Sequence, residues 1–281
     1  MNNLLIKLIR KLDTWYFQRD KINKKKLKMY LNKYHNNSYC ERNEKVKSIS
    51  IVMPCYNHAN YLSTALNSIT KQTRLPDEVI CIDDCSTDVT FEVLSNFYNN
   101  YSKEINIIIK RNKKNIGQSA SINLGVSHAN SELIMILNDD DYLMHDAIEH
   151  TLDIFNLEKD IYLLGSKSIY IYSEEHFRNL KKFTFDLTES NKYLIRKIMP
   201  ENVFNFIDGR EIDMMHSSCS FLKIAWEVVG GYIPNRKKRV ILFSDRDFQL
   251  RVNSIFPIAI LENAALAFWR INSSVDQGIF S

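Results

Sequence analysis

The stretch Asn138 to Asp141 (NDDD) has the clearest potential for chemistry, because three consecutive carboxylates follow an apolar run. That run, Leu133 to Leu137, has the length and composition of a buried strand. Adjacent like charges repel one another and lose solvation on burial, so folding alone gives no reason for them. Carboxylate oxygens suit Mg²⁺ or Mn²⁺, which substrate phosphates commonly bridge. By itself the tetrapeptide leaves two interpretations open, a cation site and a solvated acidic turn.

Alternating strand and helix patterns decide between them. Strands are expected over 49–53 (stopped by Pro54), 78–83, 105–109 and 133–137. Helices are expected over 61–70 and 117–127, and another follows the cap residues 86–88 and runs through Phe91 to Tyr98. This order predicts an α/β fold with right-handed crossovers and a mostly parallel sheet. Ligands of such sheets bind outside the carboxyl ends of the strands. Polar residues follow three of these ends, so the pattern favours a shared site over a solvated turn.

The residue types at these ends indicate individual roles. A metal held by Asp140 would stabilise charge on a leaving nucleoside diphosphate. The carboxylate of Asp84 can accept hydrogen bonds from a base or a ribose, and the ring of Tyr56 can stack on a base. These parts suit a sugar nucleotide. No Gly-x-Gly-x-x-Gly or P-loop motif follows the first strand, so a dinucleotide or P-loop nucleotide site is excluded.

Transfer of a sugar to a hydroxyl also needs a general base. Asp245 is the best candidate, because it begins a predicted helix whose dipole favours the carboxylate. An N-cap function is the competing explanation for an Asp at this position. Asp247 is the second candidate for the base.

Composition and charge narrow the class of protein. Hydrophobic residues make up 45% and charged residues 25% of 281, which is ordinary for a globular protein. No apolar run approaches the ~20 residues that span a bilayer, and no secretory signal is seen. The five cysteines are odd in number and irregularly spaced, which predicts free thiols in a reducing cytoplasm.

The positive charge belongs to the N-terminal segment. Residues 1–48 hold 13 Lys and Arg against 4 Asp and Glu, and the remainder holds 24 against 29. The acidic body makes nucleic acid an unexpected partner. Residues 1–28 combine apolar residues at helical spacing with a lysine-rich stretch. Such a helix can lie on an anionic membrane surface or pack on protein, and both interpretations stay open.

The second half of the chain is less regular. A long strand is expected over 161–172, a helix over 187–199, and closing strands over 257–261 and 264–270. Residues 235–239 form a basic loop. Residues 1–47 are interpreted as a basic helical extension, and residues 48–281 as one domain with halves 48–150 and 151–281.

Four motifs in register resemble those of family 2 glycosyltransferases with the GT-A fold. They are residues 50–57 (SIVMPCYN), 81–88 (CIDDCSTD), 115–125 (NIGQSASINLG) and 137–143 (LNDDDYL). The resemblance covers roughly residues 48–272 and is strongest up to residue 150. One such motif is weak evidence, whereas four in the same order and spacing are specific.

The resemblance implies an inverting hexosyl- or N-acetylhexosaminyl-transferase that uses a nucleotide sugar, most often a UDP-sugar, with Mg²⁺ or Mn²⁺. The acceptor would be a saccharide or a lipid-linked glycan of surface polysaccharide or glycolipid synthesis, at the cytoplasmic side of the cell membrane. The halves 48–150 and 151–281 would then bind the nucleotide sugar and the acceptor. By position, the residues implied for the nucleotide are Pro54, Tyr56, Asp84, Gly117 and Asp139, those for the metal are Asp140 and Asn138, and the base is Asp245.

Three positions depart from the family pattern. Asn138 replaces the first Asp of the Asp-x-Asp motif, which makes Asp140 the main metal ligand. Ser244 stands where an acidic residue is common, and Asn272 stands where a His would help to hold the diphosphate. Two other classes therefore remain open. One is a nucleotidyltransferase, although it lacks a Gly-rich phosphate loop, and the other is a sugar-nucleotide-binding protein with weak or no catalysis.

Overall fold

A computed structural model describes residues 42–173, 175, 193–200, 212, 214–234 and 244–271. The predicted helix in residues 1–28, the basic loop over 235–239 and Asn272 lie outside these residues. Among the residues described, no helix is long and apolar enough to cross a membrane. The four cysteines in this part of the chain are free thiols, as the sequence predicts for them.

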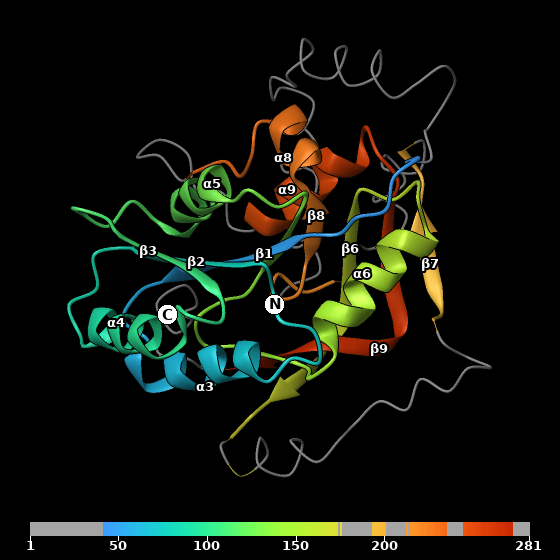
Figure 1. Cartoon of the computed structure of the whole chain (residues 1–281). Helices are drawn as coiled ribbons and strands as arrows, with labels where there is room; N and C mark the ends of the chain where they lie inside the picture. The colour runs from blue at the N-terminus through green and yellow to red at the C-terminus, as the bar shows by residue number, and fades with distance from the viewer. Residues whose placement is uncertain are drawn as a thin grey trace.

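The first half of the chain alternates strands and helices (Figure 1). Its elements in order are β1 (Ile49–Cys55), α3 (Ala59–Thr70), β2 (Glu78–Asp83), α4 (Thr90–Tyr101), β3 (Asn106–Arg111), α5 (Gln118–His128) and β4 (Leu133–Ile136). Strands β3, β2, β1 and β4 are neighbours in this order and pair in parallel. The predicted parallel sheet is thus confirmed for this half.

The second half extends the same sheet with mixed pairing. Its elements are β5 (Tyr142–Leu143), α6 (Ala147–Leu157), β6 (Leu163–Ile171), β7 (Ile195–Ile198), β8 (Ser220–Leu222), α8 (Lys223–Val229), α9 (Ser244–Asn253) and β9 (Ile258–Arg270). The described strands follow the order β3-β2-β1-β4-β8-β6-β9-β5, and β7 pairs with β9. Strand β8 is antiparallel to β4 and β6, whereas β6 and β9 are parallel. The sheet is therefore parallel in its first half and mixed in its second.

Three differences from the sequence-based expectations affect the architecture. Strand β1 continues through Pro54, because the β4 ladder already ends at Val52 and the missing N–H of Pro54 interrupts no bond to it. The helix expected over 187–199 is wrong for 195–198, which pair with β9 as strand β7. The two closing strands are one 13-residue strand, β9, whose register with β6 shifts around Lys167.

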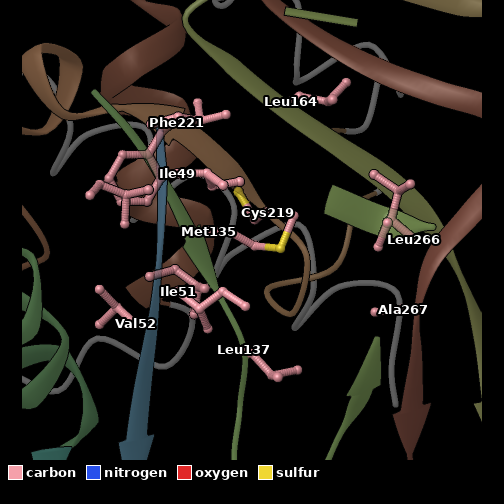
Figure 2. Packing of buried hydrophobic residues seen from close by; sticks show 14 of the residues in the cluster. Ile49, Ile51, Val52, Met135, Leu137, Leu164, Cys219, Phe221, Leu266 and Ala267 are labelled. Carbon is pink, nitrogen blue, oxygen red and sulfur yellow. The ribbon is translucent and has the colours of Figure 1, made fainter. Parts of the chain in front are cut away.

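The core lies on both faces of the sheet. Strands β1, β2 and β4 are buried along their whole length, which explains their continuous apolar sequences. Helices α3 and α4 lie on one side of the sheet, and α5, α8 and α9 on the other (Figure 1). Figure 2 shows side chains of β1 and β4 packed with those of the second half, including Phe221 and Leu266. One continuous core thus fixes the two halves of the sheet against each other.

Candidate functional site

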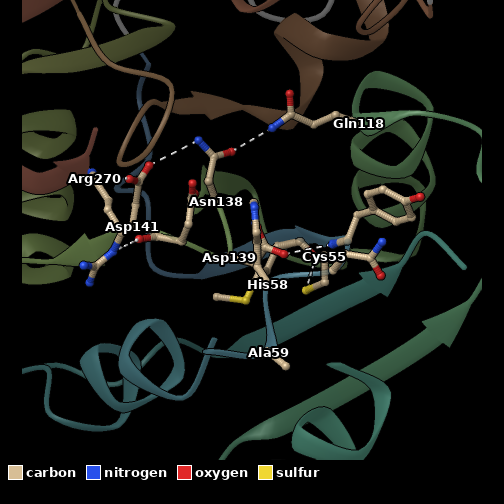
Figure 3. Close-up of polar contacts among 12 residues, drawn as sticks. Cys55, His58, Ala59, Gln118, Asn138, Asp139, Asp141 and Arg270 are labelled. Atoms are coloured by element: carbon tan, nitrogen blue, oxygen red, sulfur yellow. Dashed lines mark hydrogen bonds and ion pairs between the residues drawn. The ribbon is translucent and has the colours of Figure 1, made fainter. Parts of the chain in front are cut away.

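The carboxyl ends of β1, β2 and β4 meet at one edge of the sheet, where most of the predicted site residues lie. Cys55 pairs with Asp83, and Val52 pairs with Ile136, so the chain segments that follow these strands are neighbours. Figure 3 shows the segments after β1 and β4 in contact through hydrogen bonds. The parallel sheet therefore brings the acidic stretch and the turn after β1 together, as the sequence predicts.

Asp139 joins these two segments. Its Oδ2 accepts the backbone N–H of Tyr56 at 2.8 Å, and its Oδ1 lies 2.8 Å from Nδ1 of His58. The carboxylate is buried, and this burial raises the pKa of Asp139, although the hydrogen bond and charge of His58 lower it in part. The predicted contact of Asp139 with a ribose stays a prediction, and the structure gives Asp139 a clear function in holding the turn after β1.

Asp140 is the half-buried member of the acidic stretch. One potential ligand atom from each of His58, Asp139 and Asp140 lies within 4.8 Å of the others, a spacing that a divalent cation can bridge. The donor set of two carboxylates and one imidazole fits Mn²⁺ well and Mg²⁺ through its oxygens. His58 was not predicted from the sequence. The only local signal was its place just after the strand end, in Tyr56-Asn57-His58.

Asp141 is the least exposed of the three aspartates. Its Oδ1 accepts the backbone N–H of Arg270 at 3.0 Å, and its Oδ2 accepts hydrogen bonds from Oγ of Ser217 and Nδ2 of Asn138. Burial, with a further contribution from the charge of Asp140, raises the pKa of Asp141 to about 8. Asp141 thus connects the end of β4 to segments more than seventy residues away, a function that the sequence did not reveal.

Asn138 is engaged by its neighbours at three atoms. Its backbone N–H donates to Oγ of Ser217 at 3.0 Å. Its Oδ1 accepts from Nε2 of Gln118 at 3.0 Å, and its Nδ2 donates to Asp141 at 3.2 Å (Figure 3). The amide oxygen has a second lone pair, so ligation of a metal by Asn138 stays a prediction. These contacts show how the acidic stretch is positioned against α5.

The structure brings the predicted residues Asp84 and Gly117 into direct contact. Oδ2 of Asp84 accepts the N–H of Gly117 at 2.7 Å, and Oδ1 accepts the N–H of Ile116 and Nδ2 of Asn112, both at 2.8 Å. Gly117 precedes α5 with a φ of 87°, which favours glycine. The buried Asp84 carboxylate therefore shapes the loop before α5. Its predicted contact with a nucleoside is not tested by these bonds.

The turns after β1 and β2 are also joined. Oδ1 of Asn57, a residue with a φ of 55°, accepts the N–H of Thr87 at 2.7 Å. Oγ of Ser86 accepts the N–H of Asn57 at 3.1 Å. Pro54 is buried at the end of β1, and Tyr56 is half-buried in the turn that follows. The turn that carries Tyr56 is thus held from the β2 side as well as by Asp139.

Asp245 occupies the first turn of α9, as predicted, and is half-buried. Its charge raises the pKa of the buried thiol of Cys219 and of the Tyr232 hydroxyl, in addition to the larger effect of burial on both groups. Asp245 therefore lies near both residues. Asp247, the second candidate for the base, is buried and accepts hydrogen bonds from Nε and Nη2 of Arg251 at 2.9 and 2.8 Å. In the structure Asp247 thus forms a buried ion pair with Arg251.

The turn that carries Ser217 links this region to the acidic stretch. Ser217 contacts Asn138 and Asp141. Burial lowers the pKa of the preceding His216, and the negative charge of Asp245 raises this pKa in part. The sequence predicted neither contact, because residues 216 and 217 precede the short β8 strand and carry no periodic signal. Residues 216 and 217 thus contact or lie near both the acidic stretch and the start of α9.

Comparison with known proteins gives a consistent result. The sequence is 36% identical over 121 residues to abequosyltransferase RfbV of Salmonella typhimurium, covering 42% of this chain and 36% of that protein. It is 29% identical over 172 residues to an Escherichia coli enzyme, UDP-Gal:alpha-D-GlcNAc-diphosphoundecaprenol beta-1,3-galactosyltransferase, covering 61% of this chain and 56% of that one. The chain thus matches less than two thirds of the length of either relative.

The fold is similar to that of solved structures as well. S. aureus TarS 1-349 in complex with UDP-GlcNAc matches with a TM-score of 0.59 and 17% identity, over 81% of this chain and 60% of that one. At this identity the likeness shows the fold alone, a GT-A-like sheet flanked by helices. The sequence model of Glycosyl transferase family 2 matches residues 50–223, which is well over half of the chain and includes the acidic stretch. The chain belongs to glycosyl transferase family 2.

Proposed function

We propose that the protein is an inverting glycosyltransferase that moves a sugar from a nucleotide sugar, with UDP as the nucleotide, to a hydroxyl of a saccharide or lipid-linked acceptor. The observation that carries this proposal is the cluster of His58, Asp139 and Asp140 at the carboxyl ends of the parallel strands. Membership of the family supports the reaction class. The name of the Escherichia coli relative, a UDP-Gal:alpha-D-GlcNAc-diphosphoundecaprenol beta-1,3-galactosyltransferase, supports a UDP-sugar donor and a lipid-linked acceptor, as in surface polysaccharide synthesis.

The residues of the acidic stretch would hold Mg²⁺ or Mn²⁺. Asp140, with Asp139 and His58, supplies the ligand atoms, and Asn138 is the further candidate. When bound, such a cation neutralises the charge of a diphosphate. On the protein side, Asp141 and Ser217 keep the acidic turn in place, so that the ligand atoms stay close together without the ion.

The turns after β1 and β2 and the loop before α5 would hold the nucleoside. Pro54 and Tyr56 form one wall, and the loop held by Asp84, with Gly117 at its end, forms the other. Asp139 fixes the backbone of Tyr56 and so joins this wall to the cation site, of which it is a part. Each of these contacts to the nucleotide is part of the proposal.

Asp245 would act as the general base. It accepts the proton of the acceptor hydroxyl while that oxygen forms a bond to the anomeric carbon and the bond from this carbon to the diphosphate breaks. Because the acceptor attacks from the face opposite the leaving group, a single displacement inverts the anomeric configuration. Its place in the first turn of α9, where the helix dipole favours the carboxylate, supports this function.

Substitution of Asp245 tests the proposal. The variant Asp245→Asn should lower kcat for UDP-sugar turnover with Mn²⁺ by about 10²–10⁴-fold, because an amide cannot accept the proton. Binding of UDP, measured by calorimetry, should not change. Asp160→Asn is the matched control, since Asp160 contacts Lys197 at the surface. Full activity of the Asp245 variant would show that Asp245 is not the general base.

One observation favours a second candidate, a sugar-nucleotide-binding protein with weak or no catalysis. The Asn138 amide that replaces an Asp already contacts Gln118 and Asp141. UDP binding that is indifferent to metal, without turnover of any donor, would support this candidate. Release of pyrophosphate from a nucleoside triphosphate would instead indicate a nucleotidyltransferase, which nothing in the family assignment favours.

The domain division and the location of the protein belong to the same proposal. The halves 48–150 and 151–281 would bind donor and acceptor, and residues 1–28 would place the enzyme at the cytoplasmic face of the cell membrane through anionic lipids. Loss of sedimentation with anionic liposomes after deletion of residues 1–40 is the expected result. Sedimentation that survives the deletion would contradict the membrane contact.

A further inference from the structure

Strands β6 and β9 end at the same edge of the sheet as the candidate site. Strand β8 is antiparallel to both β4 and β6, so β6 runs in the same direction as β4, and β9 is parallel to β6. The carboxyl ends of β6 and β9 therefore lie at the edge where the acidic stretch follows β4. Ligands bind outside the carboxyl ends of strands in sheets of this kind. The residues at these two ends are thus candidates for a further contact with substrate.

Three large aromatic side chains are exposed at these two ends, and we call them the aromatic patch. They are Tyr170 in β6, Tyr172 directly after β6 and Trp269 in β9, with exposed fractions of 41%, 65% and 39%. Tyr170 pairs with Trp269 across the two strands, and their ring centroids are 5.4 Å apart. The centroids of Tyr170 and Tyr172 are 6.4 Å apart. Trp269 is the only exposed residue among the thirteen of β9, so its exposure is a local exception in a buried strand.

Arg270 connects the aromatic patch to the acidic stretch, because it comes directly after Trp269 in β9. Its backbone N–H donates to Oδ1 of Asp141 at 3.0 Å, and its Nε donates to the carbonyl of Asp140 at 3.1 Å. Its guanidinium lies over the ring of Tyr61 in α3, 4.6 Å from the centroid. These contacts fix the end of β9 against the acidic turn. The backbone of Trp269 is therefore one residue away from a direct contact with the candidate cation site.

The chemistry of the aromatic patch fits a saccharide. The face of an aromatic ring carries partial negative charge, which attracts the C–H groups on one face of a pyranose, and Tyr and Trp rings also offer a polar group to its hydroxyls. An anionic membrane surface would instead require a cluster of Lys and Arg. In the described part of the chain, the exposed charged residues within three positions of the patch are one Lys and one Glu, Lys167 and Glu175. The local charge thus favours a neutral sugar ring over anionic lipid.

We propose that the aromatic patch is the surface on which a pyranose ring of the acceptor stacks, beside the cation site. This inference rests on the proposed function, because the transfer requires an acceptor saccharide at this edge of the sheet. The rings contact the acceptor away from the reacting atoms. The patch therefore determines how tightly the acceptor binds, and the chemical step depends on other residues.

A glycan array tests the patch without turnover. Wild-type protein, in the presence of UDP and Mn²⁺, should bind members of an array of bacterial saccharides. The variant Trp269→Ala should bind the same saccharides about tenfold more weakly, and Trp269→Tyr, which keeps an aromatic face, should recover most of the affinity. Tyr98→Ala is the matched control, because Tyr98 is a similarly exposed aromatic residue of α4. A wild-type protein that binds no saccharide, or a Trp269→Ala variant that binds as the wild type does, would overturn the proposal.

Kinetics with an acceptor identified on the array separate the patch from the proposed chemistry. Trp269→Ala should raise the KM for the acceptor about tenfold and leave kcat and the affinity for UDP unchanged. A lower kcat with an unchanged KM would contradict binding by the patch. Saccharide binding that depends on Trp269, without turnover of any donor, would disprove the proposed function and leave the patch as a saccharide site.

Sedimentation with liposomes distinguishes the saccharide from a lipid surface. Wild-type protein and Trp269→Ala should sediment equally with vesicles of neutral phospholipid and with vesicles that contain anionic phospholipid. Sedimentation that is lost in Trp269→Ala and kept in Tyr98→Ala would assign the patch to the membrane and overturn the proposal.

Discussion

At the scale of single residues, three consecutive aspartates occupy three different environments. Asp139 is buried against Tyr56 and His58, Asp141 is buried against Ser217 and Arg270, and Asp140 between them is half-buried. Among the described residues, no hydrogen bond to the Asp140 carboxylate is found. The three residues are chemically identical, so their different environments arise from the residues that other segments of the chain place around each of them.

The same scale gives a prediction for Asp84. In Asp84→Asn, one amide oxygen replaces two carboxylate oxygens that accept the N–H groups of Ile116 and Gly117. The free energy of unfolding should fall by about 1–3 kcal/mol, because at least one buried donor loses its partner. UDP binding should weaken as the loop before α5 relaxes. Urea unfolding and calorimetry measure the two effects, with Asp160→Asn as the control, and unchanged UDP affinity would separate this loop from the nucleotide site.

At the scale of elements, the turn after α8 adds a contact between the two halves of the chain, because it is bonded to α5. Oδ1 of Asn123 in α5 accepts hydrogen bonds from Nε1 of Trp226 and from the N–H of Tyr232. The turn needs two consecutive glycines, Gly230 and Gly231, with φ angles of 82° and 74°. Only a left-handed pair returns the chain to α5 so soon after the helix.

The two glycines form a matched pair for mutation. A Cβ on Gly231 would lie 2.6 Å from Oδ1 of Asn123 and 2.7 Å from Nε1 of Trp226, whereas a Cβ on Gly230 would meet nothing within 4 Å. Gly230→Ala should therefore cost about 1–2 kcal/mol through its backbone alone. Gly231→Ala should cost about 1–3 kcal/mol more, because the Asn123 contacts must shift. Urea unfolding of both variants measures the difference, and equal losses would contradict the packing argument.

At the scale of the whole molecule, the two edges of the sheet differ in function. The carboxyl edge holds the candidate site, and the opposite edge holds the buried carboxylate of Glu78. Glu78 accepts hydrogen bonds from Ser50, Asn106 and Asn130, which lie on β1, on β3 and before β4. One side chain thus joins the strands at the edge remote from the chemistry.

The substitution Glu78→Gln tests these hydrogen bonds between the strands. Burial raises the pKa of Glu78, but the hydrogen bonds from Ser50 and Asn130 outweigh it, so the net pKa lies below its ordinary value. A lowered pKa in the folded state stabilises the protein above the unfolded pKa, and this stability is lost as pH falls through the folded pKa.

The expected result has two parts. At pH 7 the variant should unfold with a free energy about 1–3 kcal/mol lower than the wild type. Between pH 5 and pH 3 its stability should depend less on pH than that of the wild type, because the titrating group is absent. Glu149→Gln, at an exposed position of α6, is the control. Parallel pH curves for Glu78→Gln and the wild type would show that Glu78 contributes nothing through its charge.

The sequence by itself determined the features that depend on neighbouring residues. The strands and helices from β1 to β4 follow from local apolar periodicity, and their parallel order follows from the crossover connections. The convergence of Tyr56, Asp84 and Asp140 at one edge needs no further information than that order. The resemblance in four motifs added the family, which the comparison confirms.

Only the tertiary structure decided what depends on residues far apart in the chain. The insertion of the three-residue β8 between β4 and β6, and the strand at Ile195–Ile198, arise from pairing with partners whose own sequence gives no local sign of it. The same holds for His58 beside Asp139 and for Ser217 between the acidic stretch and α9. Hydrogen-bond partners and burial are set by packing across the sheet, so the division of the three aspartates became visible only in three dimensions.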